Sequence, residues 1–286
     1  MKILVTGASG FTGKHFIAEA RSNGHEVIAL KAKLNDVASL NQEVWSIAPT
    51  AVVHLAAITY VDHDDVEEIY RVNIVGTRNL LQALVKLDIV PRAVLLASSA
   101  NVYGNSAVEM IDESTEPMPA NDYAISKLAM EFMAKLWADR LPIFITRPFN
   151  YSGVGQSRQF LLSKIVDHFQ RGERVIELGN IDVERDFSDV RFVSKAYLAL
   201  LEKCPFGEKI NICSGVANSL NDVLVIMNDI AGYEIAVHVN PSFVRVNDVK
   251  KLYGSNSKLK SIVPKLPDIS LRETLSWMYE TSSSEI

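Results

Sequence analysis

The chain has 286 residues, 48% hydrophobic and 22% charged, a balance typical of one large or two modest globular domains. A formal net charge of -5 and the lack of any Lys/Arg block argue against nucleic acid as the main partner. The sequence shows no signal peptide, no apolar run long enough to span a membrane and only two cysteines, so we expect a cytoplasmic protein with no membrane partner and no disulfide framework.

Short apolar runs alternate with amphipathic stretches through the first half of the chain. The runs are unbroken, as expected for parallel strands that helices cover on both faces. We expect these strands at residues 3–5, 27–30, 51–55, 93–97 and 143–146. Helical patterns between them include residues 16–21, 66–87 and 123–140. This alternation predicts an α/β fold with a Rossmann-type doubly wound parallel sheet.

Beyond residue 150 the alternation loosens. Helical patterns remain at residues 160–171, 193–203, 220–231 and 271–279, with short strands at 175–178 and 209–212. We expect residues 1–150 to form the dinucleotide-binding domain. Residues 151–286 are expected to form a smaller C-terminal substrate-binding lobe, interleaved with late elements of the sheet.

A glycine-rich turn follows the first strand and opens the first helix. In such a turn one glycine permits a tight bend, the next lets backbone amides approach a pyrophosphate, and the last allows close packing of helix on strand. Its position at the start of a βαβ pattern predicts a dinucleotide cofactor. The turn residues expected to contact it are Gly7, Ser9, Gly10, Phe11, Thr12 and Gly13.

The end of the second strand carries the choice between the two nicotinamide cofactors. NAD sites usually place a carboxylate there, which accepts a hydrogen bond from the ribose 2′-hydroxyl. This strand runs instead into Lys31 and Lys33, with no carboxylate. A lysine attracts the 2′-phosphate of NADPH, whereas the plainer interpretation is a solvated lysine pair. We predict NADPH contacted by Lys31, with NADH accepted less well.

Three polar side chains are spaced for carbonyl reduction. Tyr123 and Lys127 stand four residues apart on one helix face, and Ser98-Ser99 follows the fourth strand at its carboxyl end. Hydride attack on a ketone creates an alkoxide that needs a proton, and a tyrosine whose pKa a nearby lysine lowers can supply it. Ser99 can orient the carbonyl. We predict Ser99, Tyr123 and Lys127 as catalytic, with Tyr123 and Lys127 also contacting the cofactor.

Together these motifs resemble the extended short-chain dehydrogenases/reductases that act on nucleotide sugars. The resemblance covers nearly the whole chain and rests on the glycine turn, His54-Leu55-Ala56-Ala57, Asn73 with Gly76-Thr77, Ser98-Ser99 through Tyr103-Gly104, Tyr123-x-x-x-Lys127 and Arg147-Pro148-Phe149-Asn150. It implies that Leu55, Ala56 and Ala57 line the cofactor cleft. It also implies that Asn73 supports the active-site strand within the cofactor site.

The second half resembles the branch of that family that acts on GDP-mannose derivatives, in particular the reductases of GDP-linked 4-keto-6-deoxy-mannose. The likeness lies in residues 147–156 and 179–191. It implies that Arg185 and Arg245 contact the GDP part of a nucleotide-sugar substrate, where arginine offers bidentate geometry to phosphate. The remaining expected substrate contacts are Asn101 and Asn150.

Two departures from sister families favour plain reduction. Ala100 and Asn101 stand where 4,6-dehydratases carry acidic residues, and Asn101 stands where GDP-fucose synthases carry a cysteine. We therefore expect NADPH-dependent reduction of the 4-keto group of a GDP-linked 6-deoxy-hexulose, or of a 6-deoxy-heptose analogue, by a homodimer joined through helices 66–87 and 123–140, with no metal. A nucleotide-sugar 4-epimerase, a dTDP-4-keto-sugar reductase and a cofactor-binding protein without catalysis remain as alternatives.

Overall fold

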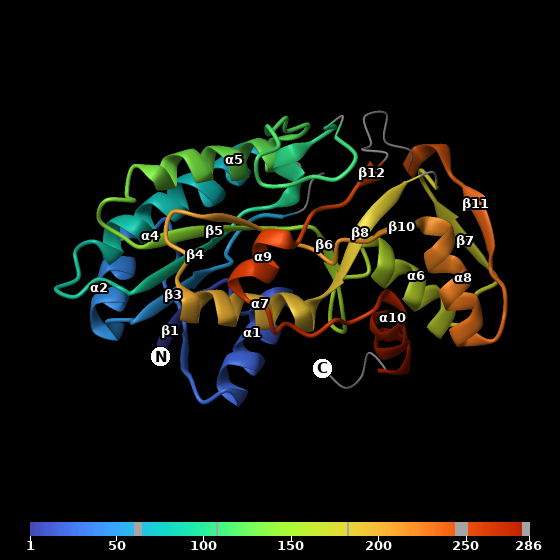
Figure 1. Ribbon diagram of the computed structural model, residues 1–286, viewed down its shortest axis with the longest axis horizontal. Coiled ribbons are helices and arrows are strands. Elements are labelled where there is room, and N and C mark those ends of the chain that lie inside the picture. The colour runs from blue at the N-terminus through green and yellow to red at the C-terminus, as the bar shows by residue number, and fades with distance from the viewer. Residues whose placement is uncertain (60–64, 107, 182, 244–250, 282–286) are drawn as a thin grey trace.

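The computed structural model describes residues 1–59, 65–106, 108–181, 183–243 and 251–281. A six-stranded parallel sheet forms the centre of the larger part, in the order β2-β1-β3-β4-β5-β9 (Figure 1). Its strands are β1 (Lys2–Thr6), β2 (Glu26–Ala29), β3 (Ala51–His54), β4 (Ala93–Ala97), β5 (Ile143–Pro148) and β9 (Lys209–Ile212). The predicted α/β fold with a Rossmann-type parallel sheet is confirmed.

The strand order places the cofactor crevice. Leu4 in β1 pairs with Ile28 on one side and with Val52 on the other, so the chain leaves β1 for one neighbour and later returns to the opposite one. The segments that follow β1 and β3 therefore diverge at the carboxyl edge of the sheet. Ligands of open α/β sheets bind at this kind of reversal.

Helices cover both faces of the sheet because successive strand residues point to opposite sides. On one face Leu40, Leu80 and Met130 pack together with strand residues such as Val52. The helical elements of that face are α2 (Val37–Ile47), α3 (Val66–Tyr70), η1 (Arg71–Gly76), α4 (Thr77–Leu84) and α5 (Asp122–Lys135). The opposite face is covered by α1 (Phe11–Ser22), α7 (Val190–Lys203) and α9 (Ser257–Ile262) (Figure 1).

The helix predicted at residues 66–87 is helical to Leu84 but is not a single α-helix. Between α3 and α4 the segment η1 is a π-helix. The wider i→i+5 turn accommodates an extra residue and is frequent at functional sites. Here it contains Asn73, whose side chain reaches back to the segment after β3.

The helix predicted at residues 123–140 ends early, at Lys135. The amides of Leu136 and Trp137 bond to carbonyls three residues back, at 3.1 and 3.0 Å. Such bonds tighten the last turn and stop the α-helical ladder. The chain then reaches β5 through a series of turns.

The second half builds a separate layer around β8 (Figure 1). Leu162, Val223 and Leu275 meet in its core. Its strands are β6 (Asn150–Ser152), β7 (Val175–Leu178), β8 (Glu184–Asp189), β10 (Ala217–Ser219), β11 (Ala236–Val239) and β12 (Lys251–Leu252). Its helices are α6 (Leu161–Gln170), α8 (Leu220–Ala231) and α10 (Leu271–Glu280). Two short 3-10 helices complete the chain: η2 (Ala100–Tyr103) follows β4, and η3 (Pro241–Phe243) follows β11.

Elements of the second half also complete the first sheet. The strand β9 pairs with β5, and α7 packs against α1 over that sheet. A division of the chain at residue 150 therefore remains a proposal about domains. In the part of the chain that the structure describes, no helix is both long enough and apolar enough to cross a membrane.

Candidate active site

A cleft of about 1500 Å³ lies at the carboxyl ends of β1, β3, β4 and β5 and continues along β6 and α6. It gathers predicted residues from distant parts of the sequence. The predicted residues that line it are Gly7, Ser9, Gly10, Phe11, Thr12, Gly13, Leu55, Ala56, Ala57, Ser99, Asn101, Tyr123, Lys127, Asn150 and Arg185. Lys31 and Asn73 are not in its lining, and Arg245 lies outside the described residues.

The glycine turn brings backbone close to backbone. Gly7 has a φ of +68°, and a Cβ atom on it would lie 2.7 Å from the backbone nitrogen of Ala56. A Cβ atom on Gly13 would clash with the carbonyl oxygen of Gly7. Gly10 precedes α1 and has no side chain that could cap the helix. The first amides of α1 are therefore available to an anionic group.

A buried chain of hydrogen bonds joins β1, β3 and α4 behind this turn. The two ring nitrogens of His54 lie 2.7 Å from the Thr6 hydroxyl and 2.8 Å from the Thr77 hydroxyl. Thr77 donates to the carbonyl oxygen of Asn73, so it accepts from the Nε2–H of His54, and Nδ1 accepts from Thr6. Burial, followed by the charge of Lys127, lowers the pKa of His54 to about 3, in keeping with this neutral ring.

Asn73 lies outside the cleft lining, in a supporting position of the kind that the resemblance implied, and its place in the cofactor site stays a prediction. Its Oδ1 accepts from the backbone nitrogen of Ile58 at 2.9 Å, and its Nδ2 donates to the carbonyl oxygen of Ile58 at 3.1 Å and to the Ser126 hydroxyl at 2.9 Å. Ser126 donates in turn to the carbonyl oxygen of Tyr123. Asn73 is only 1% exposed, and these three bonds satisfy both ends of its buried amide.

Ser99, Tyr123 and Lys127 meet at the carboxyl end of β4. The side chains of Ser99 and Tyr123 lie near enough for Ser99 to affect the pKa of the phenol, and the Ser99 hydroxyl accepts from the backbone nitrogen of Asn101 at 3.1 Å. Lys127, one turn along α5, donates from Nζ to the carbonyl oxygen of Ala97 at 2.7 Å. All three side chains are buried in the cleft wall.

The proton affinities of this group follow mainly from burial. Burial raises the pKa of Tyr123 well above its usual range, while the bond with Ser99 acts the other way. Burial also lowers the pKa of Lys127 to about 8, against the raising effect of Glu131. The expectation that the Tyr123 pKa lies below its usual value is therefore wrong for this arrangement. Desolvation of the phenolate dominates, so the phenol keeps its proton.

The second half supplies cations at the other end of the cleft. Asn150 begins β6, and Arg185 lies in β8 with its Nη1 3.0 Å from the carbonyl oxygen of Glu184. Arg158 and Lys164 line the same end, although no motif singled them out. Arg158 precedes α6 and Lys164 lies within it. The feature of the sequence that could have indicated them is their positive charge shortly after the Gly155-Gln156 turn. Such a set of cations is suited to a diphosphate.

The end of β2 holds a carboxylate that no motif indicated. Glu43 on α2 accepts from the backbone nitrogens of Lys31 at 2.9 Å and Ala32 at 2.6 Å. The Lys31 side chain is exposed. In NAD sites such a carboxylate usually lies directly after the strand. Glu43 instead lies twelve positions after Lys31 in the sequence.

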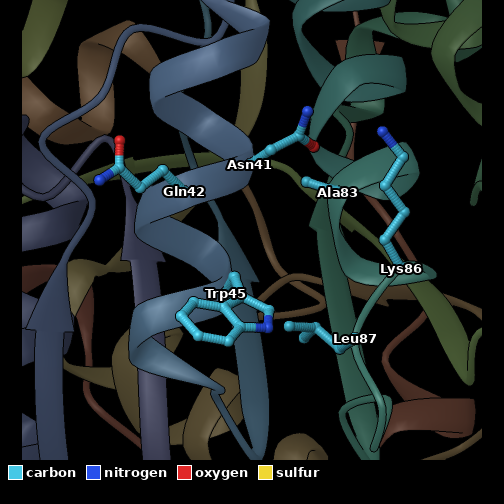
Figure 2. Close-up of a pocket in the computed structure, with 6 residues that line it drawn as sticks. All are labelled: Asn41, Gln42, Trp45, Ala83, Lys86 and Leu87. Carbon is cyan, nitrogen blue, oxygen red and sulfur yellow. The ribbon is translucent and has the colours of Figure 1, made fainter.

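A smaller hollow of about 300 Å³ lies on the outer face between α2 and α4 (Figure 2). Trp45 is 69% exposed there, and Lys86 is the charged residue of the lining. The lining offers no pair of groups for acid–base chemistry. Among the described residues no three His, Cys, Asp or Glu side chains gather where they could hold a metal ion.

Comparison with known proteins gives concordant matches. Residues 3–213 match the NAD dependent epimerase/dehydratase family. GDP-6-deoxy-D-talose 4-dehydrogenase of Aggregatibacter actinomycetemcomitans is 35% identical over 268 residues, which cover 92% of this chain and 91% of that protein. GDP-6-deoxy-D-mannose reductase of Pseudomonas aeruginosa is 34% identical over 96% and 94% of the two chains. The structure of RMD from Pseudomonas aeruginosa complexed with NADPH has a TM-score of 0.90 at 31% identity and covers 100% of both chains.

Proposed function

Because the chain belongs to the NAD-dependent epimerase/dehydratase family, we propose that it is an NADPH-dependent reductase of the 4-keto group of a GDP-linked 6-deoxy-hexulose. The names of two relatives that match nearly the whole chain support a GDP-linked 6-deoxy sugar as the substrate. The NADPH held by a similar structure supports that cofactor. A 6-deoxy-heptose analogue fits the same proposal, and NADH is a weaker substitute for NADPH.

The observation that carries the proposal is the gathering of Ser99, Tyr123 and Lys127 in the same cleft as the glycine turn. Reduction of a ketone leaves an alkoxide that must receive a proton, and a phenol held in its protonated form can give one. The same residues would take the proton back in the reverse reaction, so the proposal of reduction rests on NADPH as the cofactor.

The residues around the turn fit a dinucleotide. Gly7 and Gly13 leave the space that a side chain would fill, and the first amides of α1 can bond a diphosphate. Leu55 and Ala56 would form the wall beside it. When bound, NADPH supplies the hydride. The chain supplies the proton and holds the carbonyl.

The three catalytic residues divide this work. Ser99 donates a hydrogen bond to the substrate carbonyl and stabilises the negative charge that develops on its oxygen. Tyr123 transfers its proton to that oxygen. Lys127 lies one turn along the same helix face, where its ammonium stabilises the phenolate that Tyr123 leaves behind.

The residues after Ser99 support reduction over dehydration. Ala100 and Asn101 form the start of η2, and neither side chain can remove a proton from carbon. Asn101 lines the cleft and can donate its amide hydrogens to a sugar hydroxyl. At the far end of the cleft, Arg185 is proposed to contact the diphosphate of GDP.

We also propose a homodimer through α5 and its neighbour η1. Ile125 and Phe132 on α5 are 41% and 58% exposed, Leu136 directly after α5 is 81% exposed, and Val75 on η1 is 48% exposed. The α5 residues recur at helical spacing and so share one face. Light scattering should report twice the chain mass of 31.7 kDa, and Phe132→Glu should yield monomers. A wild-type monomer would exclude this interface.

The decisive experiment is NADPH consumption against GDP- and dTDP-linked 4-keto-6-deoxy sugars, with NMR identification of the product. We expect turnover with the GDP-linked substrates and a new hydroxyl at C4. Faster turnover of the dTDP-linked sugars would reject the GDP assignment. Interconversion of C4 epimers without net NADPH consumption, by protein that retains its cofactor through purification, would identify a 4-epimerase.

A further inference from the structure

The catalytic face of α5 continues for one more turn. Tyr123, Lys127 and Glu131 stand at four-residue intervals, and the Glu131 side chain is 1% exposed. Its Oε1 accepts from the Ser98 hydroxyl at 2.6 Å and from Nε of Arg147 at 2.8 Å. Its Oε2 accepts from Nη2 of Arg147 at 2.6 Å. These donors provide hydrogen bonds to both oxygens of the buried carboxylate.

Two consecutive residues at the end of β4 are thus held from α5. Lys127 bonds the carbonyl oxygen of Ala97, and Glu131 bonds the hydroxyl of Ser98. The next residue is Ser99, which lines the cleft together with Tyr123. The distance between the strand end and the helix is therefore set at the two residues that directly precede Ser99.

We infer that Glu131 is a positioning residue of this active site: through its bond to the Ser98 hydroxyl it fixes the end of β4 that carries Ser99 into the cleft beside Tyr123. The inference rests on the proposed function, because the role is defined by a reaction at Ser99 and Tyr123. Glu131 itself does not line the cleft and touches no reacting atom.

The charges around Lys127 are few among the described residues. Glu131 is the charged group that raises its pKa, against the lowering effect of burial. His54 on β3 is neutral, so it adds no charge at assay pH. Arg147 on β5 pairs with Glu131, and Nζ of Lys209 on β9 lies 3.8 Å from its Oε2. Both cations face Glu131, whose loss would leave positive charges alone beside the site.

A purely structural ion pair would need only Glu131 and Arg147. Arg147 is equally buried, and its guanidinium stacks at 4.8 Å on the Tyr103 ring. The bond to Ser98 adds nothing to that pair except a link to β4. Removing the Ser98 hydroxyl therefore leaves the ion pair intact and breaks the link, and because Ser98 also lines the cleft, binding of NADPH is measured beside the rate.

The first test is Ser98→Ala, with Ser194→Ala as a matched control. Ser194 is a buried serine on α7 whose hydroxyl has no hydrogen-bond partner among the described residues. We expect kcat for keto-sugar reduction to fall about ten- to hundredfold in Ser98→Ala, because small displacements of catalytic groups have effects of that size. KM for NADPH and the melting temperature should change little, and Ser98→Thr should restore part of the rate. An unchanged kcat in Ser98→Ala overturns the positioning role.

The second test is the pH profile of Glu131→Gln. Removing the carboxylate makes the Lys127 ammonium less stable, so the alkaline fall in kcat/KM should move to lower pH. Ser98→Ala retains that charge, so its alkaline limb should stay with that of the wild type. If Glu131→Gln leaves the buried charge of Arg147 too costly for folding, the double variant Glu131→Gln, Arg147→Met removes both charges and is measured in the same way.

The outcomes separate this inference from the proposed function. A wild-type protein that reduces no keto sugar rejects the proposed function before any variant is compared. A wild-type reductase whose Ser98→Ala variant is equally fast, or whose alkaline limb does not move when Glu131 is replaced, retains the function and overturns the role of Glu131.

Discussion

The hydroxyl groups of Thr12 and Tyr151 lie 2.7 Å apart and form a hydrogen bond across 139 positions of sequence. Thr12 lies in the first turn of α1, and Tyr151 lies in β6. The neighbouring Phe11 ring stacks on Tyr151, with centroids 6.1 Å apart and an interplanar angle of 14°. The glycine turn is therefore fastened directly to the second half of the chain, beside the cleft that both halves line.

This bond predicts coupled losses of stability. Tyr151→Phe and Thr12→Val each remove one partner, and each should lower the free energy of unfolding by about 1 kcal/mol, the usual net value of such a bond. The double variant should lose less than the sum, because the bond can be removed only once. Urea unfolding of the four proteins measures the coupling. Additive losses would mean that the hydroxyls do not stabilise each other.

Tyr123→Phe should remove the proton donor and keep the packing of the ring. We expect kcat to fall by about 10²–10⁴, the usual contribution of a general acid. NADPH titration and circular dichroism should stay close to the wild type. Tyr103→Phe is the matched control, because its buried hydroxyl bonds Asn211 outside the cleft lining. Near-normal turnover of the Tyr123 variant would remove this phenol from the mechanism.

The rate should depend on pH through Lys127. Its pKa of about 8 means that the ammonium is present below that pH and lost above it. The pKa of Tyr123 is raised far enough that the phenol remains protonated throughout. We therefore expect kcat/KM, which reports the free enzyme, to fall as pH rises through about 8. Lys127→Arg, which cannot lose its charge in this range, should lack the fall at whatever rate remains. A flat wild-type profile well into the alkaline range would contradict this assignment.

The nucleotide should be recognised at the cationic end of the cleft. GDP should raise the melting temperature more than dTDP or UDP, since a ligand of the native state stabilises by mass action. Arg185→Ala should lose most of this protection. Arg272→Ala, which removes an exposed arginine paired with Asp229 outside the cleft lining, should retain it. Equal protection by all three nucleotides would reject GDP as the nucleotide of the substrate, while the assignment as a reductase would stand.

The parts of the fold that could be predicted from sequence are those that local patterns determine. The strand Ala93–Ala97 could be predicted with its observed bounds because an unbroken apolar run of this length is typical of a parallel strand covered on both faces. The strand Glu184–Asp189 could not, because three of its four buried positions are polar. Asp186 is 0% exposed and accepts from the backbone nitrogens of Ser214 and Gly215, partners that no local pattern reveals.

The candidate site divides in the same way. Tyr123 and Lys127 could be predicted because one helix face sets their relation. Glu131 lies on that face too, but its importance depends on Ser98 and Arg147, which two other strands bring to it. The pKa of Tyr123 was expected to fall and instead rises, because sequence shows the neighbouring lysine and not the depth of burial.

The preference for NADPH is where local sequence and tertiary structure oppose each other. Lys31 was expected to attract the 2′-phosphate with no carboxylate nearby, yet Glu43 accepts from the backbone nitrogens of Lys31 and Ala32. A carboxylate at this point repels a phosphate, whereas the Lys31 and Lys33 side chains attract it. The preference for NADPH should therefore be modest.

Two charge changes should move that preference in opposite directions. Lys31→Asp replaces an attractive charge with a repulsive one and should shift the ratio of NADPH to NADH affinity towards NADH by about tenfold, as expected for exposed charges. Glu43→Gln removes the repulsive charge and should shift it towards NADPH. Both shifts should shrink as salt rises, because exposed charges are screened. Fluorescence titration with each cofactor at low and high salt measures them, and Lys203→Asp, at the end of α7, controls for net charge. If Lys31→Asp and Lys203→Asp give the same ratio as the wild type, Lys31 does not meet the 2′-phosphate, and the source of any preference lies elsewhere in the cleft.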